Sequence, residues 1–389
     1  MNILLANFAK MVNDSGGLAK VTCAFAKEMY QRGYKVTLVY SDDKEGDFFF
    51  EVPKDVRCYN LRHYKGRHNI YPLRYKIKRE ILRAIDQRKG RAVNNEFTKK
   101  YLLKNVKEIL DEVKPDIIVA SQPAASKVLL SDLHVTIPVI TMSHGDPEDY
   151  FHTYPVEELP SLGLSAACQV LVPSYECAIK SRYPEANVVV IGNVVPQHTV
   201  AVDLSKIKDR YNIVFIGRMV KNHKRPHLLL EAFSRLADEF SEWNLEFWGA
   251  EDDKKYTKEL LSKINHNHLQ NRVFIKGVTD DVVSVLKNSD ILGFPSAYEG
   301  FSLALTEAMS VGLPVVGYRN CSGLSELVDD GKNGFLVDDG IDDFVKKLRL
   351  LMVNRDLRTC MGEAAHEAMN QYSAKIIWDK WDMLLHEML

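Results

Sequence analysis

Two carboxylates, Glu299 and Glu307, stand in the segment whose residue types and order could do the most chemistry. We expect a strand over residues 290–294 to end in a loop that carries Glu299, and a helix to begin near Ser302. A helix that begins at the carboxyl end of a parallel strand binds phosphate, because its free backbone N–H groups point at the ligand. Carboxylates cannot serve a phosphate, but they accept hydrogen bonds from the hydroxyl groups of a ribose or a sugar. The local chemistry therefore predicts a nucleotide-sugar site.

The spacing of these carboxylates proves little by itself. Glu-x7-Glu occurs three times in the chain, at Glu231/Glu239, Glu251/Glu259 and Glu299/Glu307. We interpret the first two pairs as solvated helix faces. The third pair differs because a predicted strand, loop and helix surround it and because Glu-Gly-Phe-Ser opens it.

Two cations follow an earlier strand predicted at 211–216. Arg218 comes two residues after that strand, and Lys224 comes six residues after Arg218. Loop cations in this position can neutralise a diphosphate leaving group. The alternatives are two solvated surface cations, or Arg225 in place of Lys224.

The first half of the chain offers weaker candidates. Gly16 and Gly17 follow the first predicted strand and open a helix, where glycine lets a backbone approach a ligand closely, although plain turns also use this pair. His144 follows a strand predicted at 139–142. A lone histidine is usually structural, but this one stands at a strand end that a ligand can reach.

These motifs resemble those of retaining glycosyltransferases of the GT-B fold, specifically glycosyltransferase family 4 of the bacterial polysaccharide or lipopolysaccharide type. The resemblance is carried by residues 295–318, 320–328 and 330–337, and it is strong over about the last half of the chain. It implies two Rossmann-like domains that face each other across a deep cleft. It also implies transfer of a sugar from a nucleotide-sugar, UDP-linked rather than GDP-linked, to a glycan or lipid-linked oligosaccharide. Neither a metal nor a cofactor is implied, because the nucleotide-sugar is a substrate.

The resemblance also implies a role for each site residue. Glu307 would hold the ribose hydroxyls and Glu299 a hydroxyl of the donor sugar, while Arg218 and Lys224 would stabilise the leaving diphosphate. His144 would contact the donor sugar. The remaining donor-binding residues act mainly through their backbone: Gly16, Gly17, Val278, Phe301, Ser302 and Leu303.

Short apolar runs alternate with helical patterns along the chain, which is typical of an α/β protein with parallel sheets. The predicted strands are 2–6, 35–40, 116–120, 138–142, 168–172 and 187–191, then 211–216, 244–248, 272–275, 290–294, 313–316 and 334–337. The predicted helices are 17–32, 96–113, 174–182, 225–240, 255–265, 280–287, 302–311 and 341–353. We divide the chain into an acceptor-binding domain (1–195), a nucleotide-sugar-binding domain (196–372) and a terminal helix (373–389) that returns to the first domain.

Residues 57–107 are strongly basic. They hold sixteen Lys and Arg against three Asp and Glu, a net charge of +13 in a chain whose net charge is −1. Leu73, Ile77, Ile81 and Ile85 fall close to one helical face of this segment, with cations around them. We expect the segment to meet an anionic membrane surface; the alternative is a cationic helix packed on the sheet with its charges in water. No recognised nucleic-acid-binding motif accompanies the patch, so nucleic acid is not expected as a partner.

The rest of the composition limits where the protein works. No stretch approaches the ~20 apolar residues that span a bilayer, the N-terminus has no basic lead, and the six cysteines are scattered. We expect a cytoplasmic protein, peripheral at the inner face of the plasma membrane if the basic segment binds lipid.

Two other functions fit the same scaffold. A nucleotide-sugar 2-epimerase would need further acid and base carboxylates at the site. A two-lobed ligand-binding protein without catalysis is the second alternative, and its periplasmic examples carry a signal peptide.

Overall fold

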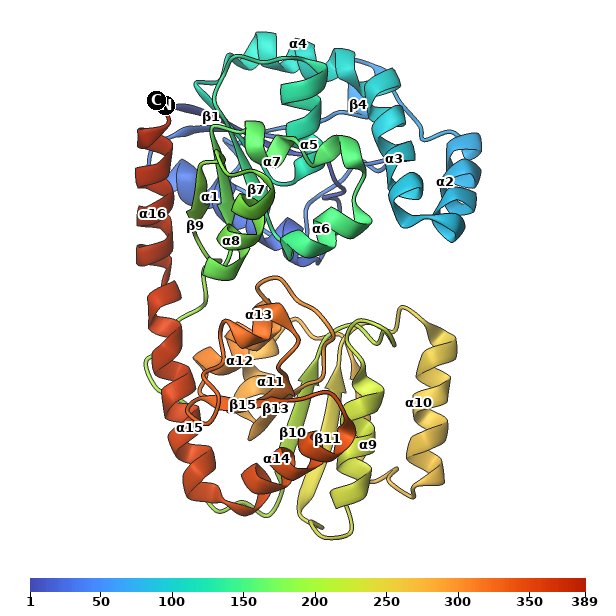
Figure 1. Ribbon diagram of the computed structural model, residues 1–389, viewed down its shortest axis with the longest axis vertical. Coiled ribbons are helices and arrows are strands. Elements are labelled where there is room, and N and C mark those ends of the chain that lie inside the picture. Colours follow the sequence, from blue (N-terminus) through green and yellow to red (C-terminus); the bar gives the residue numbers. More distant parts are fainter. The chain divides into compact units, whose positions relative to one another are not determined.

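The computed structural model describes all residues from Met1 to Leu389 and divides into two compact units. The first unit comprises Met1–Gly192 and Trp378–Leu389, and the second comprises Asn193–Ile377. Each unit holds one sheet with helices packed on it (Figure 1). The prediction of an α/β fold with two Rossmann-like sheets is confirmed.

Nine strands form the sheet of the first unit, in the order β5-β4-β3-β2-β1-β6-β7-β8-β9. Seven strands, β3-β2-β1-β6-β7-β8-β9, pair in parallel. The other two, β4 and β5, pair antiparallel and extend the sheet beyond β3. Chain order reverses on either side of β1, so the carboxyl ends of β1 and β6 mark the point at which open α/β sheets bind ligands. The strands are β1 (Asn2–Asn7), β2 (Lys35–Tyr40), β3 (Arg57–Asn60), β4 (His63–Tyr64), β5 (Arg67–His68), β6 (Ile117–Ala120), β7 (Val139–Ser143), β8 (Ala167–Val170) and β9 (Val188–Val190).

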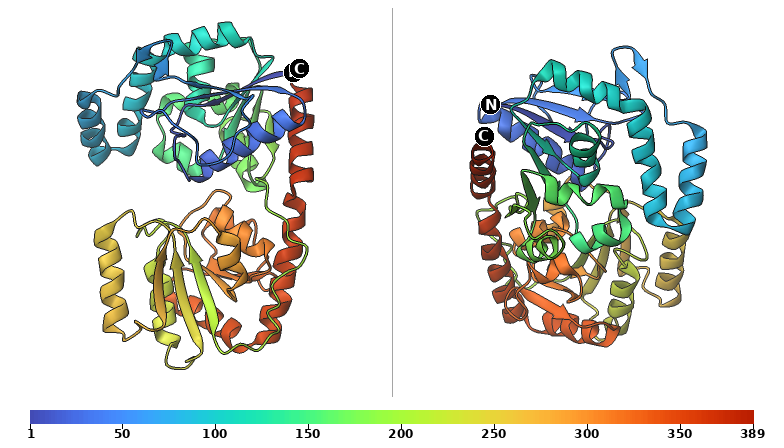
Figure 2. Two further views of the ribbon diagram at one scale, coloured as in Figure 1. Left: turned by 180° about the vertical axis from the view of Figure 1, so that it is seen from behind. Right: turned by 45° about the horizontal axis from the view of Figure 1, so that its top comes forward.

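The helices of the first unit include a hairpin of α2 and α3 at one side of the sheet (Figure 2). A Cβ atom on Gly90 of α3 would lie 2.7 Å from the Cβ of Arg83 on α2, so the two helices cross at a distance that only glycine permits. The helices are α1 (Gly17–Gln31), α2 (Leu73–Ile85), α3 (Gln87–Phe97), α4 (Leu103–Val113), α5 (Pro123–Lys127), α6 (Pro147–Thr153), α7 (Ser161–Leu164) and α8 (Pro173–Arg182).

The last helix, α16 (Ala374–Glu387), brings the end of the chain onto α1. Phe25 of α1 lies edge-on to Trp378 and Trp381, with ring centroids 6.0 and 5.0 Å apart. Arg32 also donates a hydrogen bond of 2.9 Å to Asp379. Aromatic and charged contacts together fix α16 on the first unit.

Six parallel strands form the sheet of the second unit, in the order β12-β11-β10-β13-β14-β15. Chain order reverses between β10 and β13, which places the expected ligand position at the carboxyl ends of these two strands. The strands are β10 (Tyr211–Ile216), β11 (Trp243–Trp248), β12 (Val273–Gly277), β13 (Ile291–Phe294), β14 (Val315–Tyr318) and β15 (Gly334–Val337). The helices are α9 (Pro226–Leu236), α10 (Lys254–His266), α11 (Val282–Lys287), α12 (Leu303–Ser310), α13 (Ser322–Ser325), α14 (Ile341–Val353) and α15 (Arg355–Ala368).

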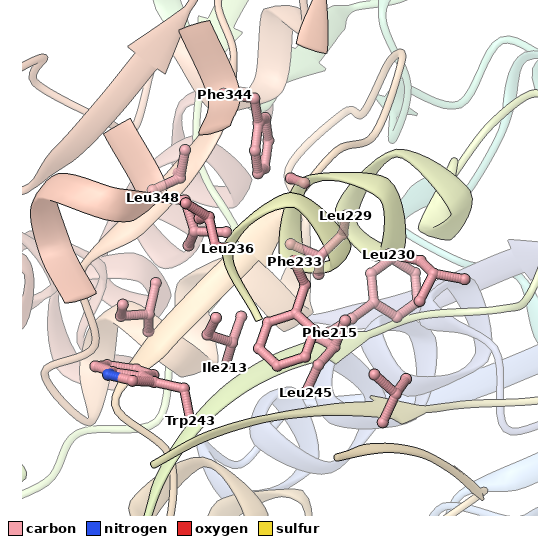
Figure 3. Close-up of a cluster of buried hydrophobic side chains, with 14 of the residues drawn as sticks. Ile213, Phe215, Leu229, Leu230, Phe233, Leu236, Trp243, Leu245, Phe344 and Leu348 are labelled. Carbon is pink, nitrogen blue, oxygen red and sulfur yellow. The ribbon is translucent and has the colours of Figure 1, made fainter. Parts of the chain in front are cut away.

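Apolar side chains of α9 and α14 cover one face of this sheet (Figure 3). Leu229 and Phe233 of α9 recur at the spacing that puts them on one helical face, and both are fully buried. Phe344 and Leu348 of α14 repeat the same spacing and pack in the same cluster. This core holds the sheet rigid beneath the loops at its carboxyl edge.

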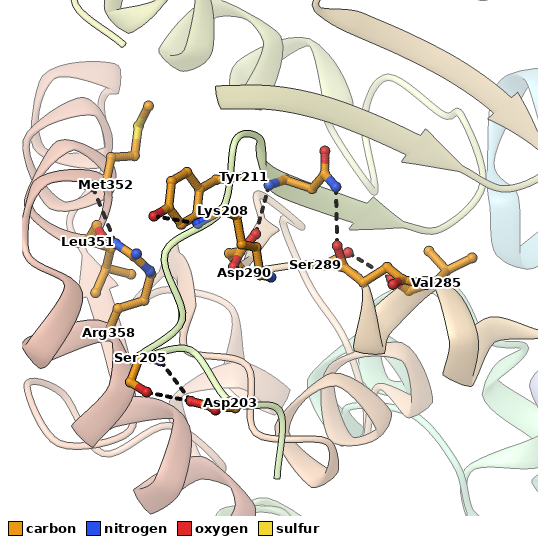
Figure 4. Close-up of polar contacts among 12 residues, drawn as sticks. Asp203, Ser205, Lys208, Tyr211, Val285, Ser289, Asp290, Leu351, Met352 and Arg358 are labelled. Atoms are coloured by element: carbon orange, nitrogen blue, oxygen red, sulfur yellow. Dashed lines mark hydrogen bonds and ion pairs between the residues drawn. The ribbon is translucent and has the colours of Figure 1, made fainter. Parts of the chain in front are cut away.

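Polar contacts at the opposite end of the sheet anchor the segment that leads into β10 (Figure 4). Lys208 donates a hydrogen bond of 2.7 Å to the buried carboxylate of Asp290, which also accepts one of 2.9 Å from the backbone N–H of Asn212. Arg358 is buried, donates a hydrogen bond of 2.6 Å to the carbonyl of Leu351, and lies over the ring of Tyr211. These contacts belong to stability, because they lie at the strand starts and not at the ligand edge.

Most predicted elements are present, and the differences concern the basic segment and the end of the chain. The helix predicted at 96–113 is present as part of a longer helical stretch, because a π-helical segment at Thr98–Leu102 joins α3 to α4. The strands β3 to β5, the short helices α5, α6, α7 and α13, and helix α15 were not predicted. Helix α2 has no fully buried residue, but its Tyr75 packs partly buried against the core of the first unit, so both interpretations of the basic helix stay predictions.

Candidate active site

The loops after β10 and β13 meet around one ion pair. The ammonium of Lys224 donates a hydrogen bond to the Glu299 carboxylate, and the two side chains are only 13% and 9% exposed. The stem of Lys224 passes Gly217, directly after β10, and its Nζ lies 5.8 Å from the ring centroid of Phe294, the last residue of β13. Lys224 therefore spans the two strand ends at which the chain order reverses.

Neighbouring contacts hold this pair in place. His223 stacks on Tyr298 with ring centroids 4.3 Å apart, and its Nε2 donates a hydrogen bond of 2.9 Å to the Tyr298 carbonyl. The same Nε2 lies 3.7 Å from Glu299, and burial lowers the pKa of His223 although the carboxylate opposes this. The backbone N–H of Ala297 closes the link with a hydrogen bond of 2.8 Å to the His223 carbonyl. The two loops thus form one connected structure.

Arg225 has a structural role that separates it from Lys224. Its guanidinium donates hydrogen bonds of 2.7 and 3.0 Å to the carbonyls of Pro295 and Ser296, and it lies over the ring of Tyr318. Its backbone is left-handed, with φ of 49° at the start of α9. Lys224, and not its neighbour, is the cation that contacts Glu299.

Arg218 lies on the same loop but is more open to solvent. Its side chain is 60% exposed and lies 3.3 Å from Asp252, which is itself 44% exposed. An exposed pair of this kind is worth roughly 0–1 kcal/mol. Arg218 can therefore exchange Asp252 for a ligand anion at little cost.

Helix α12 begins directly after this ion pair. Phe301 and Ser302 are buried, and Ser302 precedes the helix without capping it through its side chain. The first turn of a helix leaves backbone N–H groups without partners inside the helix. Glu307 lies half-buried about one turn further along the helix. This order of groups provides N–H donors for a phosphate and then a carboxylate for hydroxyls.

A close backbone approach fixes the loop that leads into α12. The N–H of Gly323 donates a hydrogen bond of 3.2 Å to the Glu299 carbonyl, and a Cβ atom on Gly323 would lie 2.0 Å from the carbonyl oxygen of Gly300. Only glycine fits there. The Gly323 that the sequence motif contains thus positions Glu299.

Val278 follows β12 at another strand end. It is 71% exposed, and Gly277 before it has φ of +78°. The carbonyl of Gly277 accepts a hydrogen bond of 2.7 Å from the N–H of Gly249. The turn thus presents its backbone at the same edge of the sheet as the ion pair.

The candidates of the first unit lie at the carboxyl edge of its own sheet. Gly16 precedes α1 with no side-chain cap, its N–H donates a hydrogen bond of 2.8 Å to Asp14, and Gly17 is the first residue of α1. His144 follows β7, its Nε2 is buried without a hydrogen-bond partner, and burial lowers its pKa to about 4. His144 is therefore neutral near pH 7 and has a ring nitrogen for a ligand hydroxyl.

The structure brings Lys224, Glu299 and the start of α12 together. Arg218 is on the same loop as Lys224, but it pairs with Asp252, which follows β11. Sequence reasoning missed His223, which contacts both Tyr298 and the carboxylate. Its only signal was its position next to Lys224. No group of three or more His, Cys, Asp or Glu side chains is placed to hold a metal ion, and no helix is long and apolar enough to span a bilayer.

Residues 200–368 match the family described as glycosyl transferases group 1. An uncharacterized glycosyltransferase of Haemophilus influenzae is 24% identical over 389 residues, which cover 97% of this chain and 98% of that protein. The poly(glycerol-phosphate) alpha-glucosyltransferase of Bacillus subtilis is 32% identical over 183 residues, which cover 46% of this chain and 26% of that enzyme. Among solved structures, a variant of S. aureus TarM in complex with fondaparinux, alpha-GlcNAc-glycerol and UDP matches with a TM-score of 0.75 at 19% identity, over 98% of this chain and 99% of TarM.

These comparisons agree with the geometry. The fold is that of GT-B glycosyltransferases, and the family match with the relatives supports a glycosyltransferase of group 1. The alternative of a nucleotide-sugar 2-epimerase is not supported.

Proposed function

We propose that the protein is a retaining, metal-independent glycosyltransferase that moves a sugar from a UDP-sugar to a glycan or lipid-linked acceptor. The observation that carries the proposal is the Lys224–Glu299 pair, which joins the ends of β10 and β13 beside the start of α12. The UDP in the TarM structure supports UDP over GDP as the nucleotide.

The donor binds along the carboxyl edge of the second unit's sheet. The backbone N–H groups at Phe301 to Leu303 hold the distal phosphate, and Glu307 accepts hydrogen bonds from the ribose hydroxyls. The backbone of the turn at Val278 holds the base. Lys224 then faces both a phosphate and Glu299, and Glu299 accepts a hydrogen bond from the donor sugar.

The reaction needs no covalent intermediate on the protein. The bond between the sugar C1 and the phosphate oxygen breaks, and its electron pair stays on the diphosphate. The acceptor hydroxyl attacks C1 from the same face and gives its proton to the departing phosphate oxygen. Lys224 and Arg218 stabilise the negative charge that develops on the diphosphate, and these two side chains thus take the role of a divalent cation. His144 contacts the donor sugar through its neutral ring.

A donor screen followed by product analysis tests this proposal. UDP-sugars and GDP-sugars are compared by calorimetry, and a turned-over acceptor is examined by NMR of its anomeric proton. We expect UDP-sugars to bind, an α-linked donor to give an α-linked product, and EDTA to leave the rate unchanged. A β-linked product would overturn retention, and activity that EDTA abolishes and magnesium restores would overturn the role of the cations. Glu299→Gln serves as the matched variant, since it keeps the shape of the side chain and removes its charge.

Association with an anionic membrane is a second part of the proposal. Leu73, Ile77, Ile81 and Ile85 of α2 are 52 to 73% exposed, and each lies four residues after the last. Residues at this spacing share a helix face, so α2 presents an unpartnered apolar stripe. Arg74, Lys76 and Arg83 are exposed on the same helix. An apolar stripe beside cations is typical of helices that lie in the interface of an anionic bilayer.

Co-sedimentation with vesicles tests the membrane part separately. Ile77→Ser with Ile81→Ser should reduce binding to phosphatidylglycerol vesicles, and the same change at Leu261, which is 45% exposed on α10 of the second unit, should not. Binding should fall with salt, because the Debye length shrinks from ~10 Å at 0.1 M to ~3 Å at 1 M. Equal sedimentation of all variants would leave α2 as a solvated helix.

A further inference from the structure

A pocket of about 370 Å³ opens at the carboxyl edge of the first unit's sheet. Its lining includes residues just beyond the ends of three neighbouring strands: Phe8 after β1, Ser41 after β2 and Gln122 after β6. This is the point at which the strand order of the unit reverses, where open α/β sheets bind ligands. The donor site proposed above involves other residues.

Three guanidinium groups from three elements line this pocket. Arg62 lies between β3 and β4, Arg79 lies on α2, and Arg91 lies on α3. All three are half-buried. We call them the arginine cluster.

Aromatic rings and hydroxyls hold the arginine cluster in place. Arg62 lies over Phe97 with its guanidinium carbon 5.2 Å from the ring centroid, and its Nε donates a hydrogen bond of 3.3 Å to the hydroxyl of Ser41. Arg91 lies 4.1 Å over Tyr154 and donates a hydrogen bond of 2.6 Å to the hydroxyl of Thr153. These partners orient the guanidinium groups without neutralising their charge.

Arg62 and Arg91 have no carboxylate within ion-pair distance, and Arg79 pairs only with its chain neighbour Glu80. Other cations of the basic segment are matched more closely. Arg67 pairs with Glu108, and Lys78 pairs with Glu96 at 2.7 Å. Arg62 and Arg91 therefore lack the counter-charge that Arg67 and Lys78 have, and the pocket stays positive.

Glu158 is the one carboxyl group that lines the pocket. It is buried and accepts a hydrogen bond of 2.7 Å from Asn95, and burial raises its pKa to about 7. A carboxyl group that is half protonated at neutral pH compensates little of the charge on three arginines, which stay protonated at any physiological pH.

Like charges held together in a half-buried pocket repel each other, and a bound anion relieves that repulsion. Arginine presents several N–H donors in a rigid planar fork, and this geometry matches the oxygens of a phosphate group. We propose that the arginine cluster binds a phosphate group of the acceptor, so that the acceptor is a phosphate-bearing glycan or a phospholipid-linked one. This inference rests on the proposed function only in assigning the phosphate to the acceptor, since the pocket would bind the anion even without sugar transfer.

Calorimetry with small probes tests the pocket in the full-length protein. Glycerol phosphate is titrated in the presence of saturating UDP, which fills the phosphate site of the second unit, and glycerol is the neutral control. We expect glycerol phosphate to bind and glycerol not to bind. Arg62→Gln and Arg91→Gln should each weaken glycerol phosphate by about tenfold, since each removes charge-assisted hydrogen bonds to the anion.

Lys89→Gln provides the matched control. Lys89 is exposed on α3, two residues before Arg91, and it does not line the pocket. We expect this variant to bind glycerol phosphate like the wild type. Equal binding by wild type and Arg62→Gln would overturn the inference, and so would an equal loss in Lys89→Gln, because the effect would then be one of net charge.

Two further binding experiments show whether the phosphate comes from a soluble polymer or from a lipid, and they separate the pocket from the proposed function. A soluble glycerol phosphate oligomer and vesicles that contain phosphatidylglycerol are compared, with the arginine variants in each arm. An effect of Arg62→Gln on the oligomer alone identifies a soluble polymer, and an effect on the vesicles identifies a lipid headgroup. If UDP fails to bind while glycerol phosphate binding still depends on Arg62, the proposed function fails and the pocket stands.

Discussion

The two units place cations at equivalent positions of similar sheets but compensate them differently. In the second unit, Lys224 spans the ends of β10 and β13 and is paired with Glu299. In the first unit, Arg62 and Arg91 line the pocket at the ends of β1, β2 and β6, with only hydroxyls and aromatic rings as partners. Both are positions where an α/β sheet binds ligands, so the difference concerns the ligand and not the scaffold.

A compensated cation and an uncompensated one suit different tasks. The Lys224–Glu299 pair is neutral without a ligand, and a donor that carries both phosphates and hydroxyls offers a new partner to each member. Arg62 and Arg91 of the arginine cluster have no ion pair to exchange, so they gain only from an anion. The comparison therefore predicts that loss of Lys224 damages both folding and chemistry, whereas loss of Arg62 or Arg91 damages binding alone.

Lys224→Ala should have the largest effect. It should lower kcat by about 100-fold or more, because one preorganised charge at the leaving group is lost. It should also lower the free energy of unfolding by about 3 kcal/mol, because it removes the ammonium that pairs with the almost buried carboxylate of Glu299. Steady-state kinetics and chemical denaturation measure the two losses.

Lys221→Ala is the control on the same loop. Its side chain is 59% exposed and lies 3.7 Å from Glu259, so its loss should change neither quantity. If Lys224→Ala retained wild-type kcat, the pair would be structural only.

Glu307→Ala should come next. The variant loses an acceptor for the ribose hydroxyls, each charge-assisted bond being worth roughly 1.5–3 kcal/mol, and should bind UDP at least tenfold more weakly while the fold stays intact. Calorimetry measures the dissociation constant. The control is Glu259→Ala, from a Glu-x7-Glu pair that we interpret as solvated, and it should bind UDP normally. Unchanged affinity in Glu307→Ala would remove Glu307 from the site.

A smaller effect separates the two units directly. Arg62→Gln should change the free energy of unfolding by less than about 1 kcal/mol, because the loss of its ring contacts is offset by relief of repulsion from Arg79 and Arg91. Lys224→Gln should cost about 3 kcal/mol in the same measurement. Equal losses in the two variants would show that the arginine cluster is compensated after all.

Much of the fold could be predicted from the sequence, and the strands at 211–216 and 334–337 have their predicted bounds. The regular alternation of apolar runs and helical patterns in the sequence predicts the order of these strands and helices. The basic segment was harder, because α3 has few apolar residues to set its period and because β4 and β5 are two residues long.

The site could be predicted only in part, for a different reason. The motif around Glu299 is continuous in sequence, so its loop and helix are readable together. The contact of Lys224 with Glu299 joins residues 75 positions apart. The arginine cluster forms because the β3–β4 connection, α2 and α3 lie together in the fold. No local sequence pattern predicts that these three segments are neighbours.

The smallest expected effect is a pH dependence of anion binding in the first unit. Burial and Glu157 raise the pKa of Glu158 to about 7, while Asn95, Arg91 and Lys127 oppose the rise. Below pH 7 Glu158 is protonated and neutral, and above pH 7 it adds a negative charge to the pocket. Sulfate is the suitable probe, because its charge is constant over this range whereas phosphate titrates. Sulfate should therefore bind a few-fold more tightly at pH 6 than at pH 8, as one extra charge in a partly solvated pocket predicts.

Glu158→Gln should bind sulfate with the pH 6 affinity at both pH values, since its amide stays neutral and keeps the shape of the side chain. Isothermal calorimetry of wild type and variant at the two pH values measures this. A pH dependence that persists in Glu158→Gln would assign the titration to another group. The second unit gives the contrast, because neither Glu299 nor Glu307 lies in this pocket and both should leave the sulfate profile of the first unit unchanged when replaced by Gln.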